Sequence, residues 1–260
     1  MPASIKPMTS LAVNWPAPGN VQTLITTRKG GFSGSPFNGL NLGLHVGDDL
    51  TCVHKNWQHL IEEKLPARPL LLNQVHGNRV VEIQGEIAEP LDIAADGAFT
   101  RQINMPCAVL TADCLPVLLC DRQGSQVTAL HAGWRGLARG IISNGVAAFS
   151  EPGELLAYLG PAICGKCFEV GSDVLEVFVS RAEQGVLGDI SVDEVRGCFI
   201  PSDKSHWLAD LFRLARLNLR GVGVQAVYSH NLCNLEDRQF YSYRRDGLTG
   251  RFASIIWLSQ

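Results

Sequence analysis

The stretch from residue 107 to residue 136 constrains the fold more than any other part of the chain. Two short apolar segments, residues 116–120 and 126–130, flank a polar stretch that contains Gly and Ser, a pattern typical of two strands joined by a turn. We therefore predict an antiparallel hairpin. Partners in a hairpin have a constant sum of residue numbers, so a turn centred between the two segments places Cys114 and His131 within about two residues of directly opposite each other.

A thiolate and an imidazole that meet at the open end of a hairpin can share a zinc ion or form a Cys/His nucleophilic pair. The alternative is simple packing, because buried free cysteines are common. The flanking residues favour chemistry. Asp113 precedes Cys114 and supplies a carboxylate, and His131 leads into a small-residue loop in which Arg135 adds a positive charge. Exposed N–H groups at the helix start predicted there can hold an anion.

Length and composition limit the class of protein. A chain of 260 residues with 46% hydrophobic residues can bury a large core, and no linker divides it, so we expect a single domain over residues 1–260. Basic and acidic residues number 22 and 25 and are interspersed, which predicts neither a nucleic-acid partner nor a membrane surface. Without an apolar leader or a membrane-spanning run, we expect a cytoplasmic protein. Nothing indicates an obligate interface, so we expect a monomer.

The eight cysteines do not predict disulfides, because a large chain without an export signal is expected to keep its thiols reduced. Cys164-Gly165-Lys166-Cys167 is a single CxxC sequence without a second pair at zinc-ribbon spacing. We interpret it as a turn.

Two segments before the hairpin carry further candidates. A strand at residues 24–27 leads into the glycine-rich loop 28–34, which either cradles an anion with Arg28 or is a flexible surface loop. His76 lies at a glycine-marked break between apolar segments, where side chains are often redirected, and is therefore a candidate ligand. His45 is more typical of a half-buried histidine.

The remaining pattern interleaves helices and short strands without a strict strand–helix–strand rhythm. This favours an α+β fold with mixed sheets in layers. A polar stretch at residues 84–98 includes a predicted tight turn at Asp96-Gly97. Periodicity predicts helices at residues 51–64, 136–149, 172–183 and 208–220, and strands at residues 70–72, 79–83, 155–159, 224–228 and 252–258.

Several motifs, taken together and in this order, resemble those of the laccase-domain, YfiH-like family. They are Thr27-Arg28-Lys29-Gly30-Gly31, Phe37-Asn38-Gly39-Leu40-Asn41-Leu42-Gly43, Asn73-Gln74-Val75-His76-Gly77, Thr111-Ala112-Asp113-Cys114-Leu115-Pro116, His131-Ala132-Gly133-Trp134-Arg135-Gly136 and Ser242-Tyr243-Arg244-Arg245-Asp246. The resemblance spans nearly the whole chain. The family has been called polyphenol oxidase, purine nucleoside phosphorylase and peptidoglycan editing factor.

The resemblance implies a layered α/β/β/α-type sandwich with mixed sheets, shared with bacterial deamidating toxins. It also implies that His76, Cys114 and His131 are metal ligands. We expect these three residues to be catalytic, with Asp113 as a candidate carboxylate for proton transfer in a deamination. Cys164 stands where the family's Gly-Pro-x-Ile-Gly-x-Cys block has a glycine, which leaves the role of that loop open. For the substrate we expect contacts from four residues: Arg28, Asn41, Arg135 and Arg245.

Three functions remain open at this point. Two imidazoles, one thiolate and an open position are the pattern of a catalytic zinc site, in which a bound water has its pKa lowered to about 7. Such a site suits adenosine deamination, and the resemblance also implies phosphorolysis of adenosine, inosine and methylthioadenosine with phosphate. Copper oxidation of phenols is a second function, but seven scattered histidines are too few for a multicopper oxidase. The third is a metal-free Cys114/His131 hydrolase that edits peptidoglycan precursors.

Overall fold

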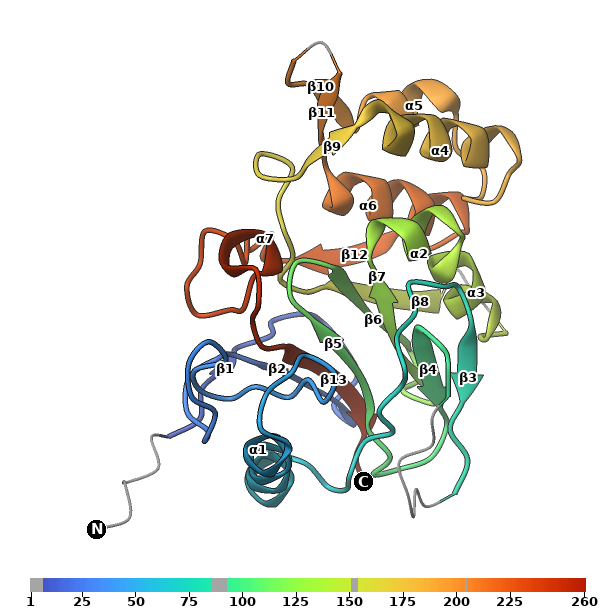
Figure 1. Cartoon of the computed structure of the whole chain (residues 1–260). Coiled ribbons are helices and arrows are strands. Elements are labelled where there is room, and N and C mark those ends of the chain that lie inside the picture. The colour runs from blue at the N-terminus through green and yellow to red at the C-terminus, as the bar shows by residue number, and fades with distance from the viewer. Residues whose placement is uncertain (1–6, 86–92, 151–153, 204) are drawn as a thin grey trace.

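Two stacked sheets form the centre of the protein, and helices cover the outer face of each (Figure 1). The computed structural model describes residues 7–85, 93–150, 154–203 and 205–260. In the six-stranded sheet the order is β12 (Ala226–Ser229), β8 (Leu155–Leu159), β6 (Leu115–Asp121), β7 (Val127–Ala132), β4 (Gly97–Thr100) and β3 (Val80–Glu82). In the four-stranded sheet the order is β1 (Ser10–Leu11), β2 (Val21–Thr26), β13 (Phe252–Leu258) and β5 (Cys107–Thr111).

The predicted hairpin is the pair β6 and β7 at the middle of the larger sheet. Pro116 lies opposite His131, which is the register predicted from the sequence. Every residue of both strands is buried, because both faces of this sheet are covered. Alternate side chains serve different layers: Leu119 packs toward the outer helices, whereas Leu118 packs toward the four-stranded sheet.

Three apolar clusters correspond to the three interfaces between four layers. One lies between α1 (Leu50–Lys64) and the four-stranded sheet, one lies between the two sheets, and the largest lies between the six-stranded sheet and the outer helices. These outer helices are α2 (Trp134–Ala138), α3 (Ile141–Ala147), α4 (Ser172–Glu183) and α6 (Leu211–Gly221). The expected α+β, layered α/β/β/α-type sandwich with mixed sheets is therefore confirmed.

Smaller elements extend this core at one end. A third sheet is antiparallel in the order β10 (Phe199–Pro201), β11 (His206–Ala209) and β9 (Glu169–Gly171). Two short helices complete the described elements: α5 (Val192–Arg196) and α7 (Tyr243–Asp246).

The structure corrects several element boundaries. The helix predicted at residues 136–149 is two helices, α2 and α3, because Gly140 has a φ of 86° and interrupts the helical backbone. The helix predicted at residues 208–220 begins at Leu211, because the residues before it pair in β11.

Two further predictions are wrong. Residues 70–72 form no strand, and Leu70 makes only an isolated bridge to Cys107. The turn predicted at Asp96-Gly97 is instead the start of β4 at Gly97. Part of the polar stretch predicted at residues 84–98 lies outside the described residues.

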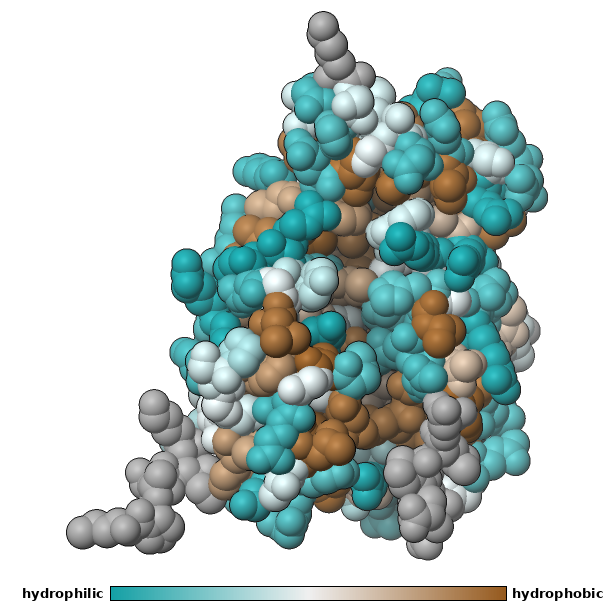
Figure 2. Space-filling view, viewed as in Figure 1, coloured by the Kyte–Doolittle hydropathy of each residue, from teal (hydrophilic) through white to brown (hydrophobic). Residues whose placement is uncertain are grey.

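Polar and apolar residues are mixed on the face shown in Figure 2. Figure 2 shows hydrophobic residues interspersed with hydrophilic ones on the face of Figure 1. None of the helices in the described part of the chain is long and apolar enough to cross a membrane.

Candidate metal centre

His76, Cys114 and His131 meet beside the connection from β5 to β6. This connection passes from one main sheet to the other (Figure 1). Cys114 lies in the short connection from β5, in one sheet, to β6, in the other. His131 is the penultimate residue of β7, and His76 arrives from the connection before β3. The three ligand atoms all lie within 4.8 Å of one another. The hairpin register therefore brings Cys114 and His131 together, and the separate connection before β3 supplies His76.

This geometry suits a tetrahedral metal ion. The Cys114 Sγ atom lies 3.7 Å from the His76 Nε2 atom. Bond lengths of zinc to sulfur and nitrogen place two such atoms about 3.6 Å apart in a tetrahedral complex. His131 uses its Nδ1 atom for a hydrogen bond to Asp96, which leaves its Nε2 atom for a metal. A thiolate and two imidazoles form a donor set that suits zinc or copper.

Asp96 supports two ligands at once and was not identified from the sequence. Its carboxylate, fully buried, lies 2.8 Å from the His131 Nδ1 atom. The same carboxylate accepts hydrogen bonds from the backbone N–H groups of Val75, His76 and Gly77, at 3.2, 2.9 and 2.6 Å. A carboxylate behind a ligating histidine fixes its orientation. In the sequence, Asp96-Gly97 has the composition of a turn, so the contact of Asp96 with the ligands could not be inferred.

Charges within the cluster shift two ionisation equilibria. Burial disfavours the charged form of each group, but the neighbouring charges outweigh it. The attraction of His131 and the hydrogen bonds from both histidines lower the pKa of Cys114 to about 6. The Cys114 thiolate and the Asp96 carboxylate in turn raise the pKa of His131 to about 9. Both shifts favour the charged forms, a Cys114 thiolate beside a His131 imidazolium.

The backbone at the cluster is unusual at two positions, and a third leaves no room for a side chain. His76 and Asp113 have φ angles of 57° and 96°, in a region that side chains other than glycine rarely adopt. Gly133 follows β7, and a Cβ atom added there would lie 2.7 Å from the Cys114 Sγ atom and 3.1 Å from the His76 Cδ2 atom. Only glycine leaves room for the ligands at this point.

A cavity of about 390 Å³ opens onto the cluster. Its lining combines three arginines with three aromatic rings and the three candidate ligands. The arginines are Arg135, Arg244 and Arg251, and the rings are Trp134, Phe168 and Tyr243. Gln74 and His45 also line it. Cationic groups beside aromatic faces suit a ligand that carries both an anionic group and a flat ring.

Asp113 lines the same cavity, but its carboxylate is held by the C-terminal part of the chain. It accepts hydrogen bonds from the Asn234 side chain, the Ser242 hydroxyl and the Arg244 backbone N–H, at 3.0, 2.6 and 2.6 Å. These contacts attach residues 234–244 to the connection that carries Cys114. A role for Asp113 in proton transfer stays a prediction.

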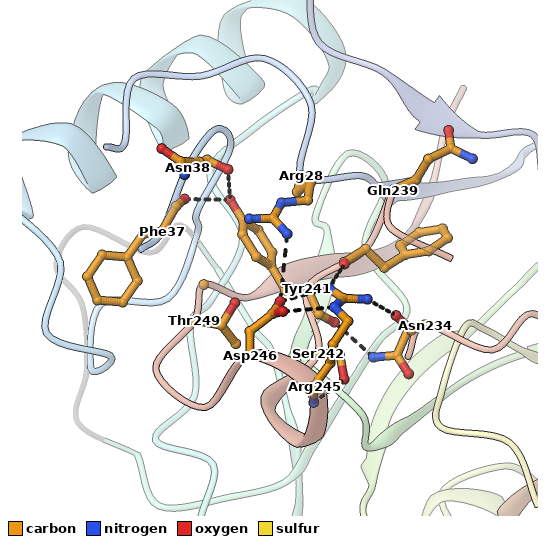
Figure 3. A network of polar contacts seen from close by, with 12 residues as sticks. Arg28, Phe37, Asn38, Asn234, Gln239, Tyr241, Ser242, Arg245, Asp246 and Thr249 are labelled. Carbon is orange, nitrogen blue, oxygen red and sulfur yellow. Dashed lines mark hydrogen bonds and ion pairs between the residues drawn. The ribbon is translucent and has the colours of Figure 1, made fainter. Parts of the chain in front are cut away.

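Three of the four residues expected to contact substrate do not line this cavity. The Arg28 guanidinium lies over the Tyr241 ring at 4.7 Å and pairs with Asp246 at 3.7 Å (Figure 3). Arg245 donates to the carbonyl oxygens of three residues, as well as to Asp246. Asn41 is fully buried and accepts from the backbone N–H groups of Gly43 and Arg251. These side chains stabilise loops around the site.

Arg135 is the expected substrate residue that does line the cavity. Its guanidinium lies 4.4 Å from the centre of the Trp134 ring. The helix that contains it, α2, has only five residues, so its dipole contributes little and Arg135 itself supplies the charge. Arg244 and Arg251 were missed, although both belong to an arginine-rich C-terminal segment visible in the sequence.

Comparison with known proteins identifies the family. The family model described as multi-copper polyphenol oxidoreductase laccase matches residues 22–259. The chain belongs to this family. Among curated members of the laccase family, a purine nucleoside phosphorylase of Pseudomonas aeruginosa is 45% identical over 252 residues, which cover 95% of this chain and 98% of that protein. Purine nucleoside phosphorylase YfiH of Escherichia coli is 41% identical over 247 residues, with 94% and 96% covered.

Solved structures agree with this assignment. The crystal structure of a Neisseria meningitidis protein matches with a TM-score of 0.85 and 45% identity, over 96% of this chain and 99% of that one. The crystal structure of the hypothetical protein YfiH of Bacillus licheniformis matches with a TM-score of 0.83 and 29% identity, over 92% and 93%. The resemblance inferred from the motifs is confirmed, and curated members of this laccase family are named as enzymes.

Proposed function

We propose that this laccase-family protein is a zinc-dependent purine nucleoside phosphorylase that also deaminates adenosine. The observation that carries the proposal is the position of the His76, Cys114 and His131 cluster on a cavity lined by arginines and aromatic rings. The names of its relatives support nucleoside and phosphate as substrates.

Phosphorolysis forms a bond between a phosphate oxygen and C1′ of the ribose and breaks the bond from C1′ to the purine N9, so that the base leaves with a proton. The chain must hold an anion against the sugar and a flat ring beyond it. Arg135 and Arg251 would bind the phosphate, and Trp134 and Phe168 would contact the base. A bound zinc ion supplies a Lewis acid that polarises an oxygen atom beside it.

Deamination of adenosine adds water at C6 and releases ammonia. This reaction needs a group that moves a proton between the water and the leaving amine. Asp113 is the carboxylate that lines the cavity beside Cys114, and its three hydrogen bonds fix its position. We therefore assign proton transfer to Asp113 within this proposal.

Multicopper oxidation of phenols fits the family's description but not the donors in this chain. Such enzymes need a blue-copper site and a separate cluster of histidine ligands. Over the described residues, two groups of three potential ligands occur, and only the His76 group contains histidine. All seven histidines of the chain lie within those residues. The same three donors suit a single copper ion, so copper is measured beside zinc.

The test combines metal analysis with product analysis. Protein purified without added metal is assayed for zinc and copper, then incubated with adenosine, with and without phosphate. We expect the purified protein to contain zinc. Adenine and ribose 1-phosphate should form only when phosphate is present, and inosine should form in both incubations. His76→Ala should fold normally by circular dichroism but lose zinc and turnover together, because only two ligands remain.

One result would overturn the metal-dependent mechanism. If His76→Ala turns over nucleoside without metal while Cys114→Ser is inactive, Cys114 is a nucleophile paired with His131. If the wild-type protein oxidises phenols but gives no purine base or inosine, the proposed substrate class is wrong.

A further inference from the structure

A second cluster of potential ligands lies outside the cavity described above. The sulfur atoms of Cys164, Cys167 and Cys233 all lie within 4.8 Å of one another. The Glu236 Oε1 atom lies 3.8 Å from the Cys167 Sγ atom. Cys233 is 66 residues beyond Cys167, so the sequence showed a single CxxC pair and only the fold completes the group.

Two turns of equal spacing face each other in this cluster. Cys164 and Cys167 are separated by two residues, and so are Cys233 and Glu236. The first turn is closed by a hydrogen bond from the Cys167 N–H to the Cys164 carbonyl oxygen, at 2.9 Å. Ala162 and Cys233 form a parallel bridge that holds the two turns together. Paired turns that each offer two ligands at this spacing are typical of structural zinc sites.

Backbone N–H groups point at one of the sulfurs. The Cys164 N–H lies 3.4 Å from the Cys233 Sγ atom. Burial opposes ionisation of Cys233, but hydrogen bonds from Cys164 and from the backbone of Leu235 and Glu236 outweigh it and lower its pKa. Burial raises the pKa of Cys164 and, to about 12, that of Cys167. A coordinating cation deprotonates such thiols outright.

We propose that Cys164, Cys167 and Cys233 bind a second thiophilic divalent cation, zinc. The Glu236 carboxylate, which lies beside Cys167 but not within 4.8 Å of all three sulfurs, would turn toward the ion as the fourth ligand. Zinc bond lengths place a sulfur and an oxygen ligand about 3.5 Å apart, close to the separation of Cys167 and Glu236. Four protein ligands leave no open position, so this site is structural.

Three thiolates and one carboxylate around a divalent cation leave a net negative charge. The adjoining cavity of about 740 Å³ is lined by both signs of charge: Lys166, Arg213 and Arg216 on one hand, and Asp210, Glu236 and Asp237 on the other. Cys198 lines the same cavity but is not part of the group, since its thiol donates to the Glu194 carbonyl oxygen at 3.5 Å.

The second site fixes one wall of the first cavity. Ile163 and Phe168 flank the CxxC turn and line the cavity of the His76 cluster. The Ile163 N–H donates to the Asp113 carbonyl oxygen at 3.0 Å. In the second turn, Asn234 follows Cys233, and its side chain donates a hydrogen bond to the Asp113 carboxylate. A cation that joins the two turns therefore holds both supports of Asp113 in place.

The experiment separates the two sites by mutation and measures zinc per chain. All proteins are purified with a thiol reductant and analysed by elemental mass spectrometry. We expect about two zinc ions in the wild type, about one in Cys114→Ser and none in Cys114→Ser combined with Cys233→Ser. Cys198→Ser combined with Cys114→Ser is the matched control and should retain its zinc. In the cobalt-substituted Cys114→Ser protein, thiolate-to-metal absorption should disappear on adding Cys233→Ser.

If Cys233→Ser does not fold, Cys167→Ser carries the same test at a more exposed position. The proposal is overturned if Cys114→Ser, folded and with its other cysteines reduced, holds no zinc. It is also overturned if two of the three cysteines form a disulfide in protein purified under reducing conditions. These outcomes do not depend on the nucleoside activity, which is measured separately through His76.

Discussion

Arginine side chains around the cavity differ in what their guanidinium groups contact. Arg28 is held between the Tyr241 ring and Asp246 and does not line the cavity. Arg135 lies against the Trp134 ring and lines the cavity, where it can reach a bound anion. The two residues look equivalent in the sequence, since each lies in a glycine-containing loop, but the structure gives them different roles.

Replacing these two arginines separates an anion contact from a structural contact. Arg135→Ala should raise the KM for phosphate about tenfold, because one charge-assisted hydrogen bond is worth about 1.5–3 kcal/mol and this side chain is exposed. Arg28→Ala should leave that KM unchanged and lower the free energy of unfolding by about 1 kcal/mol. Phosphate titrations and urea unfolding measure the two effects. The opposite pattern, with phosphate binding weakened only by Arg28→Ala, would place the anion in the glycine-rich loop.

At the scale of elements, the junction of β7 and α2 decides whether the ligands fit together. Gly133 begins this junction, and a Cβ atom there would overlap the Cys114 Sγ atom. Gly133→Ala should therefore displace Cys114 or His76 and lower zinc content severalfold, although the residue carries no ligand atom. The measurement is zinc per chain with circular dichroism as a check of folding.

Gly34→Ala is the control for this substitution. An added Cβ atom at Gly34 meets nothing within 4 Å, so zinc content should not change. Full zinc retention by a folded Gly133→Ala protein would show that the ligands can move apart and still bind the metal.

At the scale of the whole molecule, the outer helix α1 and the metal centre belong to different layers. Trp57 of α1 is 3% exposed, packs on the outer face of the four-stranded sheet and donates its indole N–H to the Leu42 carbonyl oxygen. Trp57→Ala should lower the free energy of unfolding by about 3–5 kcal/mol. Zinc content should stay unchanged, because no residue of α1 lines the cavity.

Urea unfolding and zinc analysis of the same Trp57→Ala preparation test whether stability and zinc binding are independent. His54→Ala, at an exposed position of the same helix, should change neither quantity. A fall in zinc content that parallels the loss of stability in Trp57→Ala would mean that the layers are coupled.

The sequence by itself determined the features that depend on short-range patterns. Short apolar segments on both sides of a turn set the β6–β7 hairpin and its register, so Cys114 and His131 could be placed near each other. The periodicity of α1 and α4 gave both helices within one residue at each end. The resemblance of the motifs, in order along the chain, to those of the family indicated His76 as a ligand and the layered sandwich.

Only the tertiary structure decided what depends on contacts between distant segments. Asp96 has turn-like neighbours, and its support of His76 and His131 exists only because β4 lies beside β7. Arg28 and Arg251 are equal as charges in a sequence, and packing alone directs one to Tyr241 and the other to the cavity. Cys233 joins Cys164 because a bridge links their segments. Local sequence patterns determine the backbone of each helix or strand. Sets of ligands form between elements, and the number of residues between two ligands in the sequence does not tell how far apart they lie in space.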